Sequence, residues 1–275
     1  MVNVFSFCLY GPENPKYYRG LLENIFLIGK YFPTWKVYVY YGPDVEEPML
    51  RQLEACSSVV LRATNVLGAI NMIHRFYAID EPEVDLMMVR DADSRVHWKD
   101  RWAVREFARQ SQFVAHTIRD NIEHTADMMG GLWGIRKSAG LNLHAEYSAY
   151  KEDPGKGHRN GHDQNFLTDV IYPKVVYRML VHYSNTRRKI GEYAVEFPFD
   201  WTNDVYCGRV ELEYLEYPEP PQKVRTSLSR VLPTSISMPI LTPVLPPVVS
   251  TSEQPPTLTF KNTHVPPIVK FLHRK

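Results

Sequence analysis

The chain has 275 residues, of which 44% are hydrophobic and 23% are charged, a composition typical of a globular protein with a sizeable core. Its 32 basic and 31 acidic residues leave a formal net charge of +1, which indicates neither a nucleic-acid partner nor an acidic membrane surface. The three scattered cysteines are too few for a disulfide framework or a cysteine-based zinc site.

Cellular location is predicted from what the sequence lacks. The few cysteines favour a reducing compartment. The first residues show neither the basic region nor the cleavage site of a secretory signal peptide. No apolar run approaches the roughly 18 residues of a transmembrane segment. We therefore expect a soluble, cytoplasmic protein.

The first half of the chain alternates between segments with strand-like and helix-like patterns. Strands are predicted over 2–10, 35–41 and 58–62, and helices over 16–31, 45–55 and 68–80. Alternation of this kind is typical of an α/β fold, a mostly parallel sheet covered by helices.

The second half is less regular. Strands are predicted over 113–117, 129–135 and 175–181, and helices over 138–151 and 163–171. The glycines within 129–135 indicate a close approach to neighbouring backbone. The pattern leaves open whether the sheet is doubly wound or mixed towards its carboxyl-terminal strands.

Prolines mark the main boundary. Twelve of the 21 prolines follow residue 217, in a region rich in Ser and Thr that shows no helical or strand period. We predict a catalytic domain over residues 1–216 and an extended or disordered Pro-rich tail over residues 217–275.

The most informative stretch is the apolar run Leu86–Val89, which ends in Asp91 and Asp93 with Arg90 and Arg95 beside them. Carboxylates at the end of a buried strand need a partner, and ligands bind at the carboxyl ends of strands in α/β sheets. Carboxylate oxygens suit Mg²⁺ or Mn²⁺, so the stretch predicts a metal held against a phosphate. The alternative is a salt-bridge cluster of both aspartates with Arg90 and Arg95.

Two later segments end or begin an element with polar residues. Gly161–Leu167 precedes a helix, where Asp163 is either a functional carboxylate or a helix N-cap. Val181–Asn185 ends an apolar strand, where His182 is either a third metal ligand or a hydrogen-bonded structural residue.

Basic residues supply the other expected ingredient. Arg62, Arg75 and Arg90 lie near predicted strand ends, and a guanidinium matches phosphate with two parallel hydrogen bonds. The alternative for each is a surface or core-bridging arginine. The segment His116–His124, which contains Asp120, is either an acceptor-binding loop or a solvated turn.

The order Asp91-Ala92-Asp93, then Asp163-Gln164, then His182 resembles the GT-A class of nucleotide-sugar glycosyltransferases, in particular its family-8-like branch. The resemblance implies that both aspartates and His182 hold Mn²⁺ and that Asp163-Gln164 lies beside the donor sugar. The chain departs from that branch at Tyr183–Asn185, where a glycine is expected after the histidine.

Longer stretches resemble the amino-terminal domains of chlorovirus glycosyltransferases that build the major-capsid glycan. These stretches are Phe5–Gly11, Val89–Trp102 and Met129–Lys137. The resemblance covers about residues 1–212 and implies a GT-A fold, a UDP-sugar donor, Mn²⁺ dependence and transfer of L-rhamnose to a glycan acceptor on a viral capsid glycoprotein, in the host cytoplasm.

The resemblance also implies residue roles. The nucleotide-sugar contacts are assigned to Leu9, Tyr10, Gly11, Arg62, Arg75, Arg90, Asp91 and Gln164, with uracil and ribose at the first three. Asp163 is the first candidate for the carboxylate beside the anomeric carbon, and Asp120 is the second. That group is a general base in an inverting enzyme or stabilises an oxocarbenium-like centre in a retaining one, and both remain open.

Two other functions remain open. A nucleotidyltransferase that makes sugar nucleotides also uses metal-binding aspartates, but it requires a Gly-rich, basic phosphate loop that Gly11–Pro15 does not provide. A non-catalytic sugar- or partner-binding module would use the Pro-rich tail for binding. Joint binding of UDP and Mn²⁺ distinguishes a glycosyltransferase from a binding module.

Overall fold

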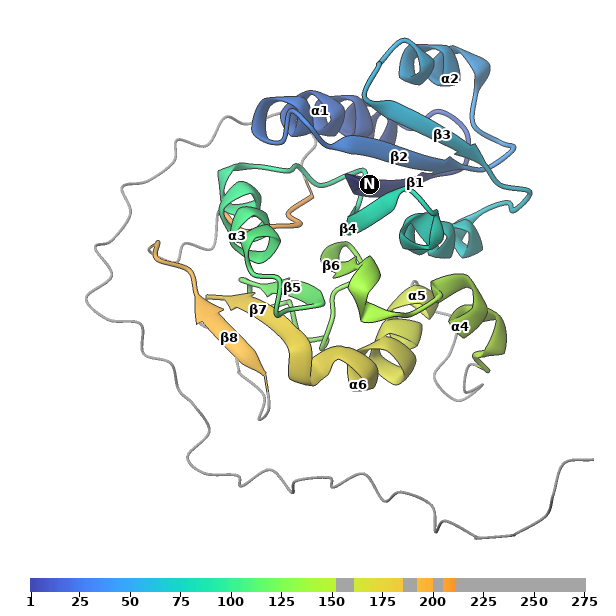
Figure 1. Cartoon of the computed structure of the whole chain (residues 1–275). Helices are drawn as coiled ribbons and strands as arrows, with labels where there is room; N and C mark the ends of the chain where they lie inside the picture. Colours follow the sequence, from blue (N-terminus) through green and yellow to red (C-terminus); the bar gives the residue numbers. More distant parts are fainter. Residues whose placement is uncertain (152–160, 185–191, 200–204, 211–275) are drawn as a thin grey trace, which may run out of the picture. The chain divides into compact units, whose positions relative to one another are not determined.

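A mixed sheet of eight strands forms the centre of the described part of the chain (Figure 1). A computed structural model describes residues 1–151, 161–184, 192–199 and 205–210. The chain divides into a unit Met1–Pro233, which contains every described residue, and a unit Thr234–Lys275. The predicted tail over 217–275 lies outside the described residues.

Parallel pairing dominates the sheet. In chain order the strands are β1 (Val2–Leu9), β2 (Lys36–Tyr41), β3 (Val59–Ala63), β4 (Val84–Arg90), β5 (Ala115–Arg119), β6 (Leu132–Arg136), β7 (Met179–Tyr183) and β8 (Tyr193–Glu196). Their spatial order is β3-β2-β1-β4-β6-β5-β7-β8. Among these strands only β6 runs opposite to its neighbours β4 and β5. The predicted α/β class is confirmed, and the sheet is mixed.

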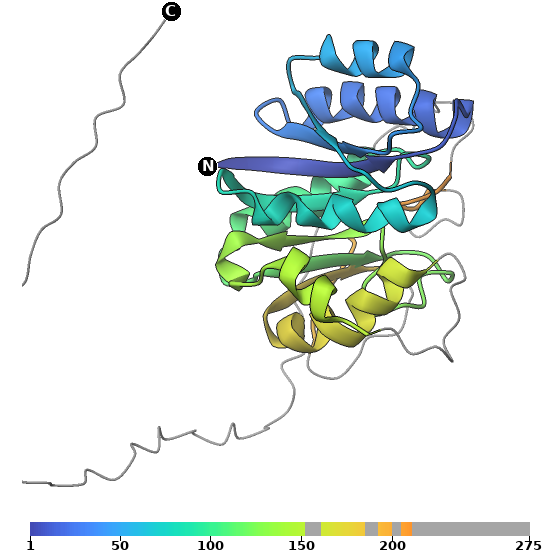
Figure 2. The same ribbon diagram turned by 90° about the vertical axis from the view of Figure 1, so that its right-hand side faces the viewer.

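Helices cover both faces of the sheet (Figures 1 and 2). They are α1 (Pro15–Tyr31), α2 (Glu47–Glu54), the 3₁₀ helix η1 (Ala69–Asp80), α3 (Trp98–Arg109), η2 (Lys137–Ala139), α4 (Leu143–Ala149), α5 (His162–Phe166), the π-helical η4 (Leu167–Ile171), α6 (Tyr172–Val175) and η5 (Val176–Arg178). No helix among the described residues is both long and apolar enough to cross a membrane.

Alternation along the buried strands separates two apolar cores. Leu86 and Met88 of β4 pack in the core with α1, α2 and α3, whereas Met87 and Val89 pack in the core with η1, α4 and α5. Such two-residue periodicity is what a strand covered on both faces requires. On β1, Ser6 lies among apolar residues and its hydroxyl donates to the Arg75 carbonyl at 2.6 Å, which fastens η1 to the sheet.

The predicted elements differ from the structure at the carboxyl-terminal end. The strand predicted over 175–181 begins only at Met179, because residues Tyr172–Arg178 remain helical through α6 and η5. Two elements were not predicted, namely α3 and β8. The helix α3 starts in a capping box in which the His97 ring accepts from the Lys99 amide and the Asp100 carboxylate accepts from the His97 amide.

Candidate active site

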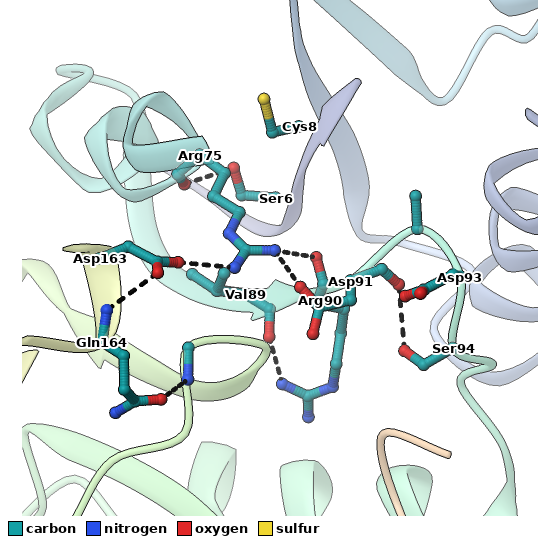
Figure 3. A network of polar contacts seen from close by, with 12 residues as sticks. Ser6, Cys8, Arg75, Val89, Arg90, Asp91, Asp93, Ser94, Asp163 and Gln164 are labelled. Atoms are coloured by element: carbon teal, nitrogen blue, oxygen red, sulfur yellow. Dashed lines mark hydrogen bonds and ion pairs between the residues drawn. The ribbon is translucent and has the colours of Figure 1, made fainter. Parts of the chain in front are cut away.

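Three segments that are distant in sequence meet at the carboxyl end of β4 (Figure 3). Asp91 follows that strand directly. Because β6 is antiparallel, with Arg90 opposite Leu132, the glycines that precede β6 lie at the same edge. Asp163 reaches this edge from the first turn of α5. The fold therefore brings together Asp91 and Asp163, which the sequence predicted as separate candidates.

Arg75 of η1 joins these two carboxylates. Its Nη1 is ion-paired with Asp91 Oδ1, and its Nη2 lies 2.9 Å from Asp163 Oδ2. The side chains of Arg75 and Asp163 are only 5% and 6% exposed, whereas that of Asp91 is 44% exposed. Burial alone would lower the pKa of Arg75, but the charges of Asp91 and Asp163 outweigh it and raise that pKa. The guanidinium is thus a fixed positive charge between one buried and one accessible carboxylate.

Two adjacent glycines make room for this cluster. A Cβ on Gly131 would overlap Asp91 Oδ2, and a Cβ on Gly130 would lie 3.1 Å from Asp163 Oδ2. The glycines noted in the sequence as signs of close backbone approach therefore face the carboxylates rather than only a neighbouring strand.

Gln164 holds the glycine segment in place. Its Oε1 accepts a hydrogen bond from the Gly130 amide at 2.9 Å, and its Nε2 donates to the Met128 carbonyl. Both ends of the Gln164 amide are thus engaged by backbone, which positions the glycine segment, and the contact of Gln164 with the donor stays a prediction. Asp163, for its part, is not the helix N-cap, which is Gly161.

Asp93 lies in the same turn as Asp91 but pairs with a different cation. The Ser94 hydroxyl donates to the Asp91 carbonyl at 3.0 Å, which closes the turn. Lys16 Nζ, from the first turn of α1, lies 2.8 Å from Asp93 Oδ2. Both aspartates form ion pairs, but the salt-bridge alternative is wrong about the partners, which are Arg75 and Lys16. Arg90 and Arg95 pair with Asp100 and Glu23 instead.

Helix α1 holds this turn in place through hydrogen bonds and an ion pair. Asn24 donates to the Ser94 carbonyl at 2.7 Å and accepts from the Val96 amide at 2.8 Å. Arg95 pairs with Glu23 at 2.6 Å. These contacts fix the position of the turn relative to α1.

The loop after β1 lies beside this edge, because β1 is the parallel neighbour of β4. The side chain of Leu9 is buried in the core, and its carbonyl accepts from the Gly42 amide at 2.9 Å. Tyr10 is half-buried, which raises the pKa of its hydroxyl to about 12. Gly11 has φ 81°, and no atom lies within 4 Å of where its Cβ would be. Tyr10 and Gly11 are the two residues of this predicted set that present accessible surface.

Two of the predicted phosphate-binding arginines are engaged elsewhere, which corrects the prediction. Arg62 pairs with Glu81 through two hydrogen bonds of 2.9 and 3.1 Å from Nε. Arg90 is almost fully buried, and its Nε lies 2.8 Å from the buried Asp100 carboxylate. Figure 3 shows its guanidinium pointing away from the Arg75–Asp91 contact. Only Arg75 of the three lies among the candidate carboxylates.

Asp120, the second catalytic candidate, lies in a separate buried network. Its carboxylate is 2.7 Å from Lys99 Nζ and accepts from the Cys207 amide at 3.0 Å. Desolvation opposes ionisation, but contacts with His124 and Lys99 outweigh it and lower the pKa of Asp120 to about 2. A fully buried carboxylate held by these partners cannot reach a substrate, so Asp120 is structural in this fold.

The third predicted metal ligand, His182, is also corrected by the structure. It is fully buried, with Nδ1 2.8 Å from His116 Nε2 and Nε2 3.1 Å from Glu106 Oε2. Both ring nitrogens are therefore engaged by β5 and α3, and no nitrogen is left to complete a site with Asp91 and Asp93.

The residues present at the β4 turn fit a divalent cation. The ion pairs engage Oδ1 of Asp91 and Oδ2 of Asp93, so an ion that binds here either shares each carboxylate with its resident cation or displaces that cation. Mg²⁺ and Mn²⁺ are often bound through one or two carboxylates, with phosphate oxygens and water completing the shell. A two-carboxylate site is therefore chemically sufficient without His182.

One other group of metal-ligating side chains occurs in the described part of the chain, namely His97, Asp100 and Cys207. The His97 ring caps α3 by accepting from the Lys99 amide at 3.2 Å, and Asp100 is ion-paired with Arg90. Burial raises the pKa of the Cys207 thiol well above its ordinary value, which opposes the thiolate that a metal needs. This group therefore serves the start of α3.

Sequence reasoning missed Lys16 and Asn24 and did not foresee that Arg75 bridges two carboxylates. The adjacent glycines at 130 and 131 were the one local signal that pointed to crowding at this edge. Lys16 shows no such signal, because a lysine in the first turn of an amphipathic helix is common in sequence.

No protein-family model and no curated protein matches the chain. Solved structures do resemble it. One is a glycosyltransferase involved in the glycosylation of the major capsid of PBCV-1, with 15% identity, 66% of this chain and 82% of that chain covered, and a TM-score of 0.44. A second is the mannosyltransferase PcManGT from Pyrobaculum calidifontis in complex with GDP-Man and Mn²⁺, with 14% identity, coverage of 50% and 45%, and a TM-score of 0.39.

A third similar structure is a CMP:2-keto-3-deoxy-manno-octonic acid synthetase complexed with CTP, with 9% identity, coverage of 67% and 91%, and a TM-score of 0.44. The structural neighbours therefore include both glycosyltransferases and nucleotidyltransferases. At these identities and scores the likeness carries no argument about activity, which has to come from the residues of this chain.

Proposed function

We propose that the chain is a metal-dependent GT-A glycosyltransferase that moves a sugar from a UDP-sugar to a hydroxyl group of a glycan acceptor. The observation that carries the proposal is the cluster at the end of β4, in which Arg75 joins the accessible Asp91 to the buried Asp163. Asp93 adds a second carboxylate in the same turn. Sequence resemblance further supports L-rhamnose as the sugar and a capsid glycoprotein as the acceptor.

Departure of a nucleoside diphosphate is the demanding part of such a reaction, because negative charge develops on the leaving phosphate. A divalent cation held by Asp91 and Asp93 would neutralise that charge. Arg75 contributes a further fixed positive charge at the same edge. Preorganised charges of this kind lower the barrier without having to rearrange during the reaction.

In this proposal Asp163 is the carboxylate that faces the anomeric carbon. Its ion pair with Arg75 holds its orientation. A carboxylate in this position can accept the acceptor's proton or stabilise an oxocarbenium-like centre. Tyr10 and Gly11, at the end of the neighbouring β1, are proposed to receive the uracil and ribose.

The test is release of UDP from UDP-L-rhamnose and other UDP-sugars by the purified chain, with Mn²⁺ and with EDTA. We expect turnover only with Mn²⁺ and a loss of about 100-fold or more in Asp93→Ala. Asp85→Ala is the matched control, because Asp85 lies near the opposite, amino-terminal end of the same strand.

Undiminished turnover in Asp93→Ala would overturn the metal site. Release of pyrophosphate from UTP and a sugar 1-phosphate, without transfer from UDP-sugars, would instead identify a nucleotidyltransferase. A chain that binds neither UDP nor Mn²⁺ would fit the non-catalytic alternative.

A further inference from the structure

Lys16 is in direct contact with Asp93. Its Nζ lies 2.8 Å from Asp93 Oδ2, with side chains 31% and 12% exposed. The start of α1 does not need this side chain, because Asn14 caps the helix by accepting from the Lys16 amide at 3.0 Å. The Lys16 ammonium therefore pairs with Asp93 and is not needed to cap the helix.

At the carboxyl end of β4 the negative and positive side chains nearly cancel one another. Three carboxylates, those of Asp91, Asp93 and Asp163, face two cations, Arg75 and Lys16, which leaves one net negative charge. A divalent cation would turn this into one net positive charge, which suits an anionic diphosphate.

The two resident cations differ in how easily they can leave. Arg75 is 5% exposed and bonds two carboxylates at once, so displacing it would leave Asp163 buried and unpaired. Lys16 bonds one carboxylate at a partly exposed site, and such pairs are weak. The Lys16 ammonium also lies 5.0 Å from the centre of the exposed Tyr17 ring, which offers it a second favourable contact.

We propose that Lys16 is an exchangeable counter-ion: it occupies Asp93 when no divalent cation is bound, the cation displaces it, and the released ammonium then strengthens binding of the nucleoside diphosphate. The proposal rests on the proposed function, because it takes Asp93 as a metal-binding carboxylate. It gives Lys16 opposite effects on the two ligands.

The experiment measures Mn²⁺ binding to the purified full chain without nucleotide, by electron paramagnetic resonance of free Mn²⁺. Lys16→Met removes the competing ammonium, so we expect Mn²⁺ to bind about three- to fivefold more tightly. Lys16→Arg keeps the charge and should bind Mn²⁺ as the wild type does. Lys30→Met removes an exposed charge from the last turn of the same helix and should also leave Mn²⁺ affinity unchanged.

Calorimetric titration of UDP at saturating Mn²⁺ is the second measurement. Here Lys16→Met should bind UDP about three- to fivefold more weakly than the wild type, the opposite direction from its effect on Mn²⁺. A purely structural role for the ion pair would lower both affinities together. Unchanged or weaker Mn²⁺ binding by Lys16→Met overturns the exchange.

Asp93→Ala separates this proposal from the proposed function. If the wild type binds Mn²⁺, Asp93→Ala weakens that binding and Lys16→Met leaves it unchanged, only the counter-ion exchange is wrong. If Asp93→Ala leaves Mn²⁺ binding unchanged, or the wild type binds none, the metal site and the exchange are both overturned. Thermal unfolding of each variant checks that it is folded.

Discussion

Arg75 makes the candidate site possible, because a single buried guanidinium holds carboxylates from two different elements. Removing one partner of a buried ion pair costs about 3–5 kcal/mol, since the other charge stays buried and uncompensated. Arg75→Met would therefore disturb folding as well as activity. Asp163→Asn is the sharper substitution, because the amide keeps an oxygen that can accept from Arg75 Nη2.

We expect Asp163→Asn to lower kcat by about 10²–10⁴-fold, because the neutral amide can neither take a proton nor stabilise positive charge. The KM for the UDP-sugar should change much less. Asp169→Asn is the control, since Asp169 is an exposed aspartate shortly after Asp163 in the chain. Steady-state kinetics of both variants measure kcat and KM. An unchanged kcat in Asp163→Asn would exclude a catalytic role for Asp163.

Helix α1 is the element that positions the aspartate turn. Asn24 bonds the backbone on both sides of Arg95, and Gly20 allows the helix to approach the turn closely. A Cβ at Gly20 would overlap the Ala92 carbonyl, whereas one at Gly29 of the same helix would meet nothing within 4 Å. The two glycines therefore form a matched pair for testing the contact.

Gly20→Ala should lower the free energy of unfolding by about 1–3 kcal/mol, because backbone has to move to admit the methyl group. Gly29→Ala should raise it by about 0.5–1 kcal/mol, as expected for alanine in place of glycine inside a helix. Urea denaturation measures both. Gly20→Ala should also weaken Mn²⁺ binding, because the moved segment carries Asp93. Equal stabilities of the two variants would contradict the assigned contact.

At the scale of the whole molecule, a buried ionic network joins three separate segments. Asp120 follows β5, Lys99 belongs to α3, and Cys207 lies in the described segment 205–210. Because the pKa of Asp120 is lowered from 3.8 to about 2 in the folded chain, ionised Asp120 stabilises the fold above its unfolded pKa. That contribution is lost as the pH falls through about 2.

The shift corresponds to about 2 kcal/mol of stability at neutral pH. Urea unfolding of the wild type should therefore show this loss between about pH 4 and pH 2. Asp120→Asn should be less stable at pH 7, because Lys99 loses its partner, but it should lose less stability on acidification. Equal acid dependence of the two proteins would show that the folded pKa of Asp120 is not lowered.

Much of the fold follows from local pattern. Two-residue and helical periodicities located seven of the eight described strands and most of the helices, because each reports which face of an element is buried. They also placed Asp91 at the end of a buried strand, where α/β sheets bind ligands. The pattern predicts strand for η5 and for the last residue of α6, because a short apolar run is ambiguous between helix and strand.

The ionic partners, by contrast, were decided only by the tertiary structure. Arg90 stands next to Asp91 in sequence, yet on a strand successive side chains point to opposite faces, and Arg90 pairs with Asp100 of α3. The partner of Asp91 comes instead from η1, on the other side of the sheet. A long, flexible cation can reach many carboxylates, so the order of residues does not determine which one it meets.

The sequence by itself thus determined the class of fold and the strand that carries the two aspartates, because periodicity and turn chemistry are local properties. Only the tertiary structure decided that Asp163 joins Asp91, that Lys16 holds Asp93 and that His182 belongs to a separate buried network. These pairings depend on strand order and on the antiparallel β6, which brings Gly130 and Gly131 against the carboxylates. Strand order arises from long-range packing, which no local pattern encodes.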